Sequence, residues 1–303
     1  MTTGERVLVT GAKGLIGSHV LSLLGDQADV YAVSRSPTPS VDRINWISCD
    51  LGESGSARDL IEQVRPNVVL HLAGAVRGDR SLDAVHPTLT ANLVATVELL
   101  EAATRAQVRR IVASGSLLEE PTGEGATLVP PSPYGASRWA STSYARMFHL
   151  LFETPVTILR PSYAYGPRQD TTKLLPHVIN NALRGERAEL ASGERRIDFV
   201  FAEDVARAYL AAATAPAVDG ETIDIGSGLM TRVRDFVAAA IDLLGPDRPQ
   251  PIFGAVGERP FEQEIPVDTA PAARLLDWTA STSLDEGLRK TVAWYVQQAQ
   301  AGA

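Results

Sequence analysis

The chain has 303 residues, and its 28 Lys and Arg against 36 Asp and Glu give a net charge of −8 at pH 7. This length allows one large α/β domain or two smaller ones, and an acidic balance without basic clusters argues against nucleic acid or an anionic membrane as the main partner. No apolar stretch approaches the roughly 20 residues of a membrane span, and the N-terminus enters a strand directly, so we expect a cytoplasmic protein. The five histidines lack metal-ligand spacing, so no metal site is predicted.

Short apolar runs alternate with helical patterns through the first half of the chain. The pattern predicts strands over 6–11, 29–34, 44–49, 67–74, 110–116 and 155–161, and helices over about 14–25, 55–65, 81–106 and 134–153. Nearly continuous apolar strands separated by helices indicate a parallel sheet that is covered on both faces. We therefore expect an α/β fold with a Rossmann-type doubly wound parallel sheet, which binds its ligands at the carboxyl ends of the strands.

The regular alternation of strand and helix patterns ends after Pro167. Helices are predicted over about 173–184, 203–214, 231–244, 270–277 and 284–299, with short strands near 197–201, 222–226 and 251–253. We expect a dinucleotide-binding domain over residues 1–167 and a smaller α/β C-terminal substrate-binding lobe over 168–303. The two are expected to interleave, because the strand and helix near 197–226 are predicted to return to the first domain.

A glycine turn joins the first strand to the first helix. Gly11, Gly14 and Gly17 lie in "VLVTGAKGLIGSHV". A tight turn, close approach of the backbone to a pyrophosphate and helix N–H groups that face its charge all favour glycine here. Because the strand, the turn and the helix are all in place, the motif predicts a dinucleotide site.

A second motif lies near the start of the helix predicted over 134–153, where Tyr134 and Arg138 stand four residues apart and therefore share a face. With the G-x-x-G-x-x-G turn, this pair resembles the short-chain dehydrogenase/reductase superfamily, and more specifically its extended branch, the NAD(P)-dependent nucleotide-sugar epimerase/dehydratase family. The resemblance runs nearly end to end, through "TGAKGLIG" (10–17), "CDL" (49–51), "HLAG" (71–74), "ANLVATVELLEAA" (91–103), "SGS" (114–116), "YGASR" (134–138), "LRPSYAYGPR" (159–168), "RRIDFVFAEDVARA" (195–208), "IDIGSG" (223–228), "LLDW" (275–278) and "SLDEGLRKTVAWY" (283–295).

The end of the second strand bears on the choice of nicotinamide cofactor. An acidic residue there would bind the ribose hydroxyls of NAD and repel a 2′-phosphate, but this chain has Ser34 and Arg35. Arginine can pair with the phosphate while serine donates a hydrogen bond, so NADP(H) is favoured and NAD(H) remains the alternative. The resemblance implies further dinucleotide contacts at Leu15, Ile16, Asp50, Leu51, Leu72, Ala73, Gly74, Asn92 and Pro161, together with Tyr134 and Arg138.

The resemblance also implies the reacting groups. A tyrosine exchanges a proton with the substrate oxygen, and Tyr134 matches it; a hydroxyl holds that oxygen, and Ser116 matches it, with Ser114 as the alternative. Tyrosine titrates near 10 in isolation, so a nearby cation is needed for work near neutral pH. In the family this cation is a lysine, and this chain has Arg138 instead. Arginine keeps the charge but does not deprotonate, so a proton relay through this side chain is not expected.

The residues after Ser116 bear on the reaction. Leu117 and Leu118 follow it, whereas Glu119 and Glu120 stand too far along for the acid of the family's dehydratases. The remaining reaction is simple hydride transfer, and we expect NADPH-dependent reduction of a keto group on a nucleotide-linked 4-keto-6-deoxy sugar. The alternatives are an NAD-dependent nucleotide-sugar C4 epimerase and a catalytically impaired NAD(P)-binding regulatory protein, for which Arg138 would be the signature.

The substrate side is less defined by sequence. Ser116, Tyr163 and Arg196 are the candidate substrate contacts, with Tyr163 standing where relatives often carry Asn, and Arg196 as a candidate for the sugar's diphosphate. Arg160 is expected to organise local loops. The helices predicted over 81–106 and 134–153 carry broad apolar faces, and in the resembling family these helices pair across a two-fold axis, so a homodimer is expected.

Overall fold

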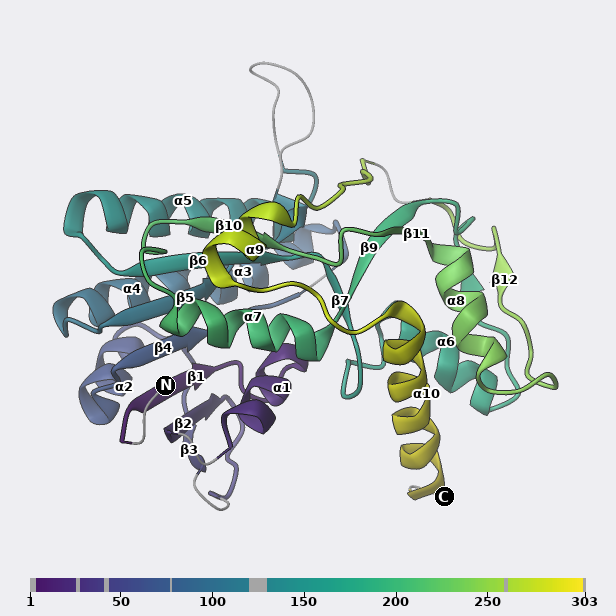
Figure 1. Ribbon diagram of the computed structural model, residues 1–303, viewed down its shortest axis with the longest axis horizontal. Coiled ribbons are helices and arrows are strands. Elements are labelled where there is room, and N and C mark those ends of the chain that lie inside the picture. Colours follow the sequence, from purple (N-terminus) through teal and green to yellow (C-terminus); the bar gives the residue numbers. More distant parts are fainter. Residues whose placement is uncertain are drawn as a thin grey trace.

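The computed structural model describes residues 4–25, 28–40, 44–76, 78–119, 130–258 and 261–301. A seven-stranded parallel sheet in the order β10-β6-β5-β4-β1-β2-β3 forms the centre of the larger part (Figure 1). Its strands are β1 (Arg6–Thr10), β2 (Asp29–Ser34), β3 (Ile44–Ser48), β4 (Val68–His71), β5 (Arg110–Ser114), β6 (Val156–Pro161) and β10 (Thr222–Ile225). The predicted Rossmann-type doubly wound sheet is therefore confirmed.

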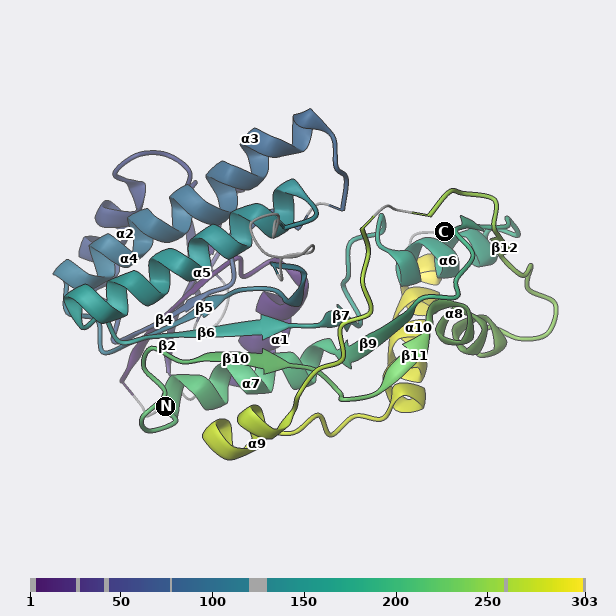
Figure 2. The same cartoon turned by 90° about the horizontal axis from the view of Figure 1, so that it is seen from above.

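Helices cover both faces of this sheet (Figure 2). In β1, Val7 and Val9 join one core while Leu8 between them joins the other, because successive strand residues point to opposite faces. The first core includes side chains of α1 (Leu15–Leu24), α7 (Ala202–Thr214) and α9 (Ala270–Leu276), and the second includes side chains of α2 (Ser56–Val64), α4 (Ala95–Arg105) and α5 (Pro133–Phe152).

The helix predicted over 81–106 is interrupted. It consists of a 3-10 turn over Leu82–Ala84, α3 (Val85–Thr88), a π-helical turn over Leu89–Val94 and then α4. A π turn inserts one residue into the helical ladder, and such turns often occur at functional sites. Asn92 lies inside it and is fully buried.

The C-terminal part builds a third, smaller core. A three-stranded sheet in the order β11-β9-β7 and a two-stranded sheet, β12-β8, lie beside three helices; these elements are β7 (Tyr163–Tyr165), β8 (Glu189–Leu190), β9 (Arg196–Phe201), β11 (Met230–Arg232), β12 (Ile252–Phe253), α6 (Leu174–Leu183), α8 (Val233–Asp242) and α10 (Leu284–Ala301). Phe199 stacks on Phe236 with ring centroids 3.8 Å apart at its centre. The chain crosses back twice, first through α7 and β10, which pairs with β6 in the large sheet, and then through α9. The division into 1–167 and 168–303 stays a prediction.

The strand order reverses between β1 and β4. From β1, strands β2 and β3 extend the sheet to one side, and β4 and the later strands extend it to the other. Such a switch point opens a crevice at the carboxyl ends of the strands. Among the described residues, no helix is both long and apolar enough to cross a membrane.

Candidate active site

The glycine turn lies at the switch point and is closely packed. Gly11 has φ +66°, and a Cβ there would lie 2.6 Å from the backbone N of Ala73, just after β4. A Cβ on Gly17 would lie 2.3 Å from the carbonyl oxygen of Gly11. Helix α1 begins after Gly14, and no described side chain caps it. Its first-turn N–H groups therefore face a backbone cradle that suits the pyrophosphate of a dinucleotide.

The end of β2 lies beside this turn. The N–H of Ala12 donates to the carbonyl of Val33 at 3.3 Å. The hydroxyl of Ser34 donates to the carbonyl of Ser36 at 2.6 Å, and Arg35 is exposed. Lys13, on the glycine turn, places its Nζ 5.7 Å from the ring centroid of Trp46 in β3. Two cations, Lys13 and Arg35, thus stand at the edge where the adenosine ribose of a dinucleotide would lie.

The other predicted cofactor contacts follow the carboxyl ends of neighbouring strands. Leu15 and Ile16 are half-buried on the first turn of α1, and Pro161 ends β6. Asp50 is exposed and accepts a hydrogen bond from the N–H of Gly52, whereas Leu51 is buried in the core beneath it. The segment after β4 contains Leu72, Ala73 and Gly74.

A chain of hydrogen bonds runs from this segment into the protein. The N–H of Ala73 donates to Thr10 Oγ1 (3.1 Å), Thr10 Oγ1 contacts His71 Nδ1 (2.8 Å), and His71 Nε2 contacts Thr96 Oγ1 (3.0 Å). Thr96 Oγ1 donates to the carbonyl of Asn92. Because Thr96 gives its proton to Asn92, Nε2–H must donate to Thr96, and in the neutral imidazole Nδ1 then accepts from Thr10. Burial, with Arg138 adding a smaller effect, lowers the pKa of His71 to about 3.

The side chain of Asn92 forms hydrogen bonds to other groups of the protein. Its Oδ1 accepts from the N–H of Ala75 (2.8 Å), and its Nδ2 donates to the carbonyl of Ala75 (3.1 Å) and to Ser137 Oγ (2.9 Å). It thereby ties the segment after β4 to α5. Its direct contact with a cofactor stays a prediction.

Tyr134 lies in the first turn of α5. Ser132 caps this helix by accepting from the N–H of Gly135 at 3.0 Å, and Pro133 occupies the first helical position. Gly135 lets the helix approach the preceding loop, because a Cβ there would lie 2.5 Å from the carbonyl oxygen of Leu118. The helix start is therefore packed against the turn that follows Ser116.

Arg138 is 2% exposed and directed toward Tyr134. Its Cζ lies 5.8 Å from the ring centroid of Tyr134, and its Nη1 donates to the carbonyl of Ser114 at 2.8 Å. Its Nε is buried and has no hydrogen-bond partner among the described residues. The guanidinium is thus held beside the phenol, with one buried donor that has no partner among the described residues.

The two candidate serines differ in their partners. Ser114 Oγ donates to the carbonyl of His71 (3.0 Å) and lies 2.7 Å from the hydroxyl of Tyr209. Among the described residues, Ser116 Oγ accepts one bond, from the N–H of Leu118 at 3.2 Å, and has no acceptor for its own proton. The hydroxyl of Ser116 is therefore better suited to hold a substrate oxygen.

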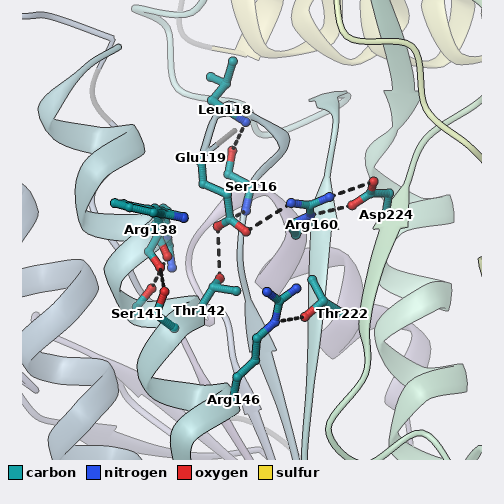
Figure 3. A network of polar contacts seen from close by, with 12 residues as sticks. Ser116, Leu118, Glu119, Arg138, Ser141, Thr142, Arg146, Arg160, Thr222 and Asp224 are labelled. Atoms are coloured by element: carbon teal, nitrogen blue, oxygen red, sulfur yellow. Dashed lines mark hydrogen bonds and ion pairs between the residues drawn. The ribbon is translucent and has the colours of Figure 1, made fainter. Parts of the chain in front are cut away.

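A buried carboxyl lies directly behind Ser116. Glu119, in the 3-10 turn over Leu117–Glu119, is 1% exposed and contacts Ser116, Thr142 and Arg160 (Figure 3). Burial raises the pKa of Glu119 to about 7, opposed by Arg160, Thr142, the backbone of Ser116 and Arg138. Sequence reasoning gave Glu119 no part in the site, and only its burial reveals one. Glu120 lies outside the described residues.

Two of the predicted substrate contacts line one cleft. Tyr163 and Arg196 lie there with Leu117 and Leu118, the residues that follow Ser116. Both are engaged by neighbouring side chains. Arg195 donates to the hydroxyl of Tyr163 at 3.2 Å, and Arg196 forms two bonds to one carboxylate oxygen of Glu264, at 3.0 and 2.8 Å. A substrate diphosphate would have to replace that carboxylate at Arg196.

Comparison with known proteins agrees with this geometry. The family model for the NAD-dependent epimerase/dehydratase family matches residues 7–226. The chain belongs to this family. Among curated members, the UDP-glucose 4-epimerase of Mycolicibacterium smegmatis is 30% identical over 97% of this chain and 100% of that protein. The dTDP-glucose 4,6-dehydratase of Neisseria gonorrhoeae is 29% identical over 97% of each chain.

A solved structure of the same family was determined with ligands. MoeE5 in complex with UDP-glucuronic acid and NAD is 29% identical, superposes with a TM-score of 0.86 and covers 97% of this chain and 99% of its own. The expected membership of the nucleotide-sugar epimerase/dehydratase family is therefore confirmed. This chain is accordingly an enzyme of that family, and its relative MoeE5 binds NAD and UDP-glucuronic acid.

Proposed function

We propose that this protein transfers a hydride between a nicotinamide dinucleotide and C4 of a nucleoside-diphosphate sugar, with Tyr134 as the acid/base. The observation that carries the proposal is the position of the Arg138 guanidinium, 5.8 Å from the centroid of the Tyr134 ring and bonded to the strand end that leads to Ser116. A fixed cation beside the phenol stabilises the negative charge that develops on the phenol oxygen during proton exchange.

The roles follow from the side chains. The nicotinamide would supply or accept the hydride. Ser116 donates a hydrogen bond to the substrate oxygen and Tyr134 gives it a proton as the keto group becomes an alcohol, or takes one in the reverse direction. Arg138 keeps its charge throughout, so it stabilises the tyrosinate and the proton returns to Tyr134 from solvent.

For the direction of the reaction, we propose NADPH-dependent reduction of a nucleotide 4-keto-6-deoxy sugar. The chain has no acidic residue over 30–41, where NAD would need one for its ribose hydroxyls, and Lys13 and Arg35 stand at that edge. Both cations favour a 2′-phosphate.

A second candidate is NAD-dependent C4 epimerisation of a nucleotide sugar. It is favoured by the full-length similarity to a UDP-glucose 4-epimerase and by NAD bound in MoeE5. Both candidates use the same residues at C4. They differ in whether the dinucleotide leaves oxidised or is regenerated in place.

The test mixes the purified protein with NADPH or NADH and a panel of nucleotide 4-keto sugars, and follows nicotinamide absorbance. A reductase consumes NADPH with the 4-keto sugar, whereas an epimerase interconverts UDP-glucose and UDP-galactose without net consumption. Tyr134→Phe should lower either turnover by about a hundredfold or more. Dinucleotide binding without turnover of any sugar, or wild-type turnover in Tyr134→Phe, would overturn the proposal.

A further inference from the structure

The face of α5 that carries the reacting groups extends one turn beyond Arg138. Tyr134, Arg138 and Thr142 stand four residues apart, so they lie on one side of the helix. All three are at most 7% exposed. The third member, Thr142, is the one that meets Glu119.

A single carboxylate oxygen joins this helix to the end of β5. Glu119 Oε2 accepts from Thr142 Oγ1 at 3.0 Å and from the N–H of Ser116 at 3.3 Å (Figure 3). The oxygen thus bonds on one side to the residue that bears the candidate hydroxyl and on the other to the helix that bears the candidate acid/base. Hydrogen bonds to a buried carboxylate are among the stronger ones in proteins.

The other carboxylate oxygen is held from the sheet. Glu119 Oε1 lies 3.5 Å from Arg160 Nη1, and Arg160 forms two bonds to Asp224 in β10, at 2.6 and 2.9 Å. The guanidinium of Arg160 therefore stands between two carboxylates. Because Arg160 keeps Asp224 as its partner, removing the charge of Glu119 does not leave this arginine unpaired.

We propose that Glu119 is a positioning residue of the reaction centre, whose carboxylate sets the distance between the Ser116 hydroxyl and the α5 side chains Tyr134 and Arg138. This inference rests on the proposed function, because it assigns Glu119 to the geometry of that same site. Catalysis depends steeply on such distances, since a displacement of about 1 Å can cost about a hundredfold in rate. Glu119 itself contacts no substrate in this arrangement.

The hydrogen bond from Thr142 to Glu119, which links α5 to the end of β5, can be removed with little change in side-chain volume. Thr142→Val deletes the hydroxyl, and we expect kcat to fall by about 10- to 100-fold while the Kd of the dinucleotide changes less than about threefold. Thr142→Ser restores the donor and should recover most of the lost kcat. The matched control is Thr291→Val, which removes a fully buried hydroxyl from α10 in the third core and should leave kcat unchanged.

Variants of Glu119 separate the effect of its hydrogen bonds to Ser116 and Thr142 from the effect of its negative charge. Glu119→Gln keeps an oxygen that can accept both bonds, whereas Glu119→Ala removes it, so Glu119→Gln should retain several-fold more kcat than Glu119→Ala. Wild-type kcat in both Thr142→Val and Glu119→Ala, with the wild type active, would overturn the inference and leave the proposed function intact.

Amide hydrogen exchange of the peptide over 114–119 gives a readout that does not need turnover. Exchange should be faster in Thr142→Val and Glu119→Ala than in the wild type and Thr291→Val. In Glu119→Ala the N–H of Ser116 loses its acceptor, and in Thr142→Val that acceptor is no longer held by α5. An inactive wild type would refute the proposed function. Unchanged exchange in both site variants would refute the link itself.

Discussion

The guanidinium of Arg138 fills the space that a side chain at Gly74 would need, because a Cβ on Gly74 would lie 2.0 Å from Arg138 Nη2 and 2.9 Å from its Cζ. The segment after β4 can therefore pass the wide guanidinium only with glycine at this position. A lysine at 138 would reach the site with a narrower side chain. The structure thus shows how the segment after β4 makes room for the guanidinium of Arg138.

The first prediction follows from this contact. Gly74→Ala should lower kcat by about tenfold or more, because the new methyl group displaces the guanidinium from Tyr134. In the Arg138→Lys background the same substitution should have a smaller effect, from the remaining contact with Asn92 Oδ1 at 2.7 Å, which gives a coupling energy of about 1–3 kcal/mol in a double-mutant cycle. Gly257→Ala, at a glycine with open space around it, is the control. Additive effects at 74 and 138 would contradict the steric account.

The second prediction concerns the two serines. Ser116→Ala should lower kcat by about a hundredfold, since it removes the donor to the substrate oxygen. Ser114→Ala should mainly cost stability, because the hydroxyl of the buried Tyr209 loses its partner. Thermal unfolding and initial rates measured on both variants separate these effects, and the opposite ranking in kcat would assign the role to Ser114.

The third prediction concerns the cofactor. Arg35→Asp should raise the Kd of NADPH by about tenfold or more and leave that of NADH unchanged or lower, because a carboxylate repels a 2′-phosphate and accepts from ribose hydroxyls. Fluorescence titration of both dinucleotides measures the change. Arg58→Asp, at an exposed arginine on α2, controls for the change in net charge. If both dinucleotides weaken equally in Arg35→Asp, Arg35 does not select between them.

The fourth prediction concerns Glu119 and pH. Its pKa is about 7 in the folded chain against an ordinary value of 4.5, so the folded state binds more protons than the unfolded state between these values. The free energy of unfolding should therefore fall as pH rises from 4.5 to 7, by about 3 kcal/mol from this group. Glu119→Gln has no such loss and should melt at a higher temperature than the wild type at pH 8. The difference should close toward pH 5, and a lower melting temperature at pH 8 would contradict it.

The fifth prediction concerns His71, which lies between Thr10 and Thr96 and stays neutral when folded. Its pKa is near 3 in the folded chain and 6.5 ordinarily, so the unfolded state binds more protons between these values. The free energy of unfolding should fall by about 1.4 kcal/mol for each pH unit below 6.5. His71→Gln should flatten this slope in chemical unfolding measured from pH 6.5 to 4.5, whereas His86→Gln, at an exposed residue, should not. Equal slopes in His71→Gln and the wild type would contradict the assignment.

The regular elements were predictable because their periodicity is local. The strand predicted over 29–34 coincides with β2, and the six strands predicted in the first half all appear within a few residues of their expected limits. Strands β7, β8 and β11, of two or three residues each, were not predicted, whereas β12, also of two residues, lies within the strand predicted near 251–253. The π turn before α4 was also missed, because it keeps the apolar pattern of the helix while changing its hydrogen bonds.

The sequence by itself determined the doubly wound fold, the glycine turn at its switch point and the pairing of Tyr134 with a cation one helical turn away, because each is written in residues that are near neighbours along the chain. Only the tertiary structure decided that Glu119, Thr142 and Arg160 meet behind Ser116 and that Gly74 makes room for Arg138. These contacts join residues from separate strands and helices. Their distances depend on how the elements pack, and spacing along the chain carries no record of packing.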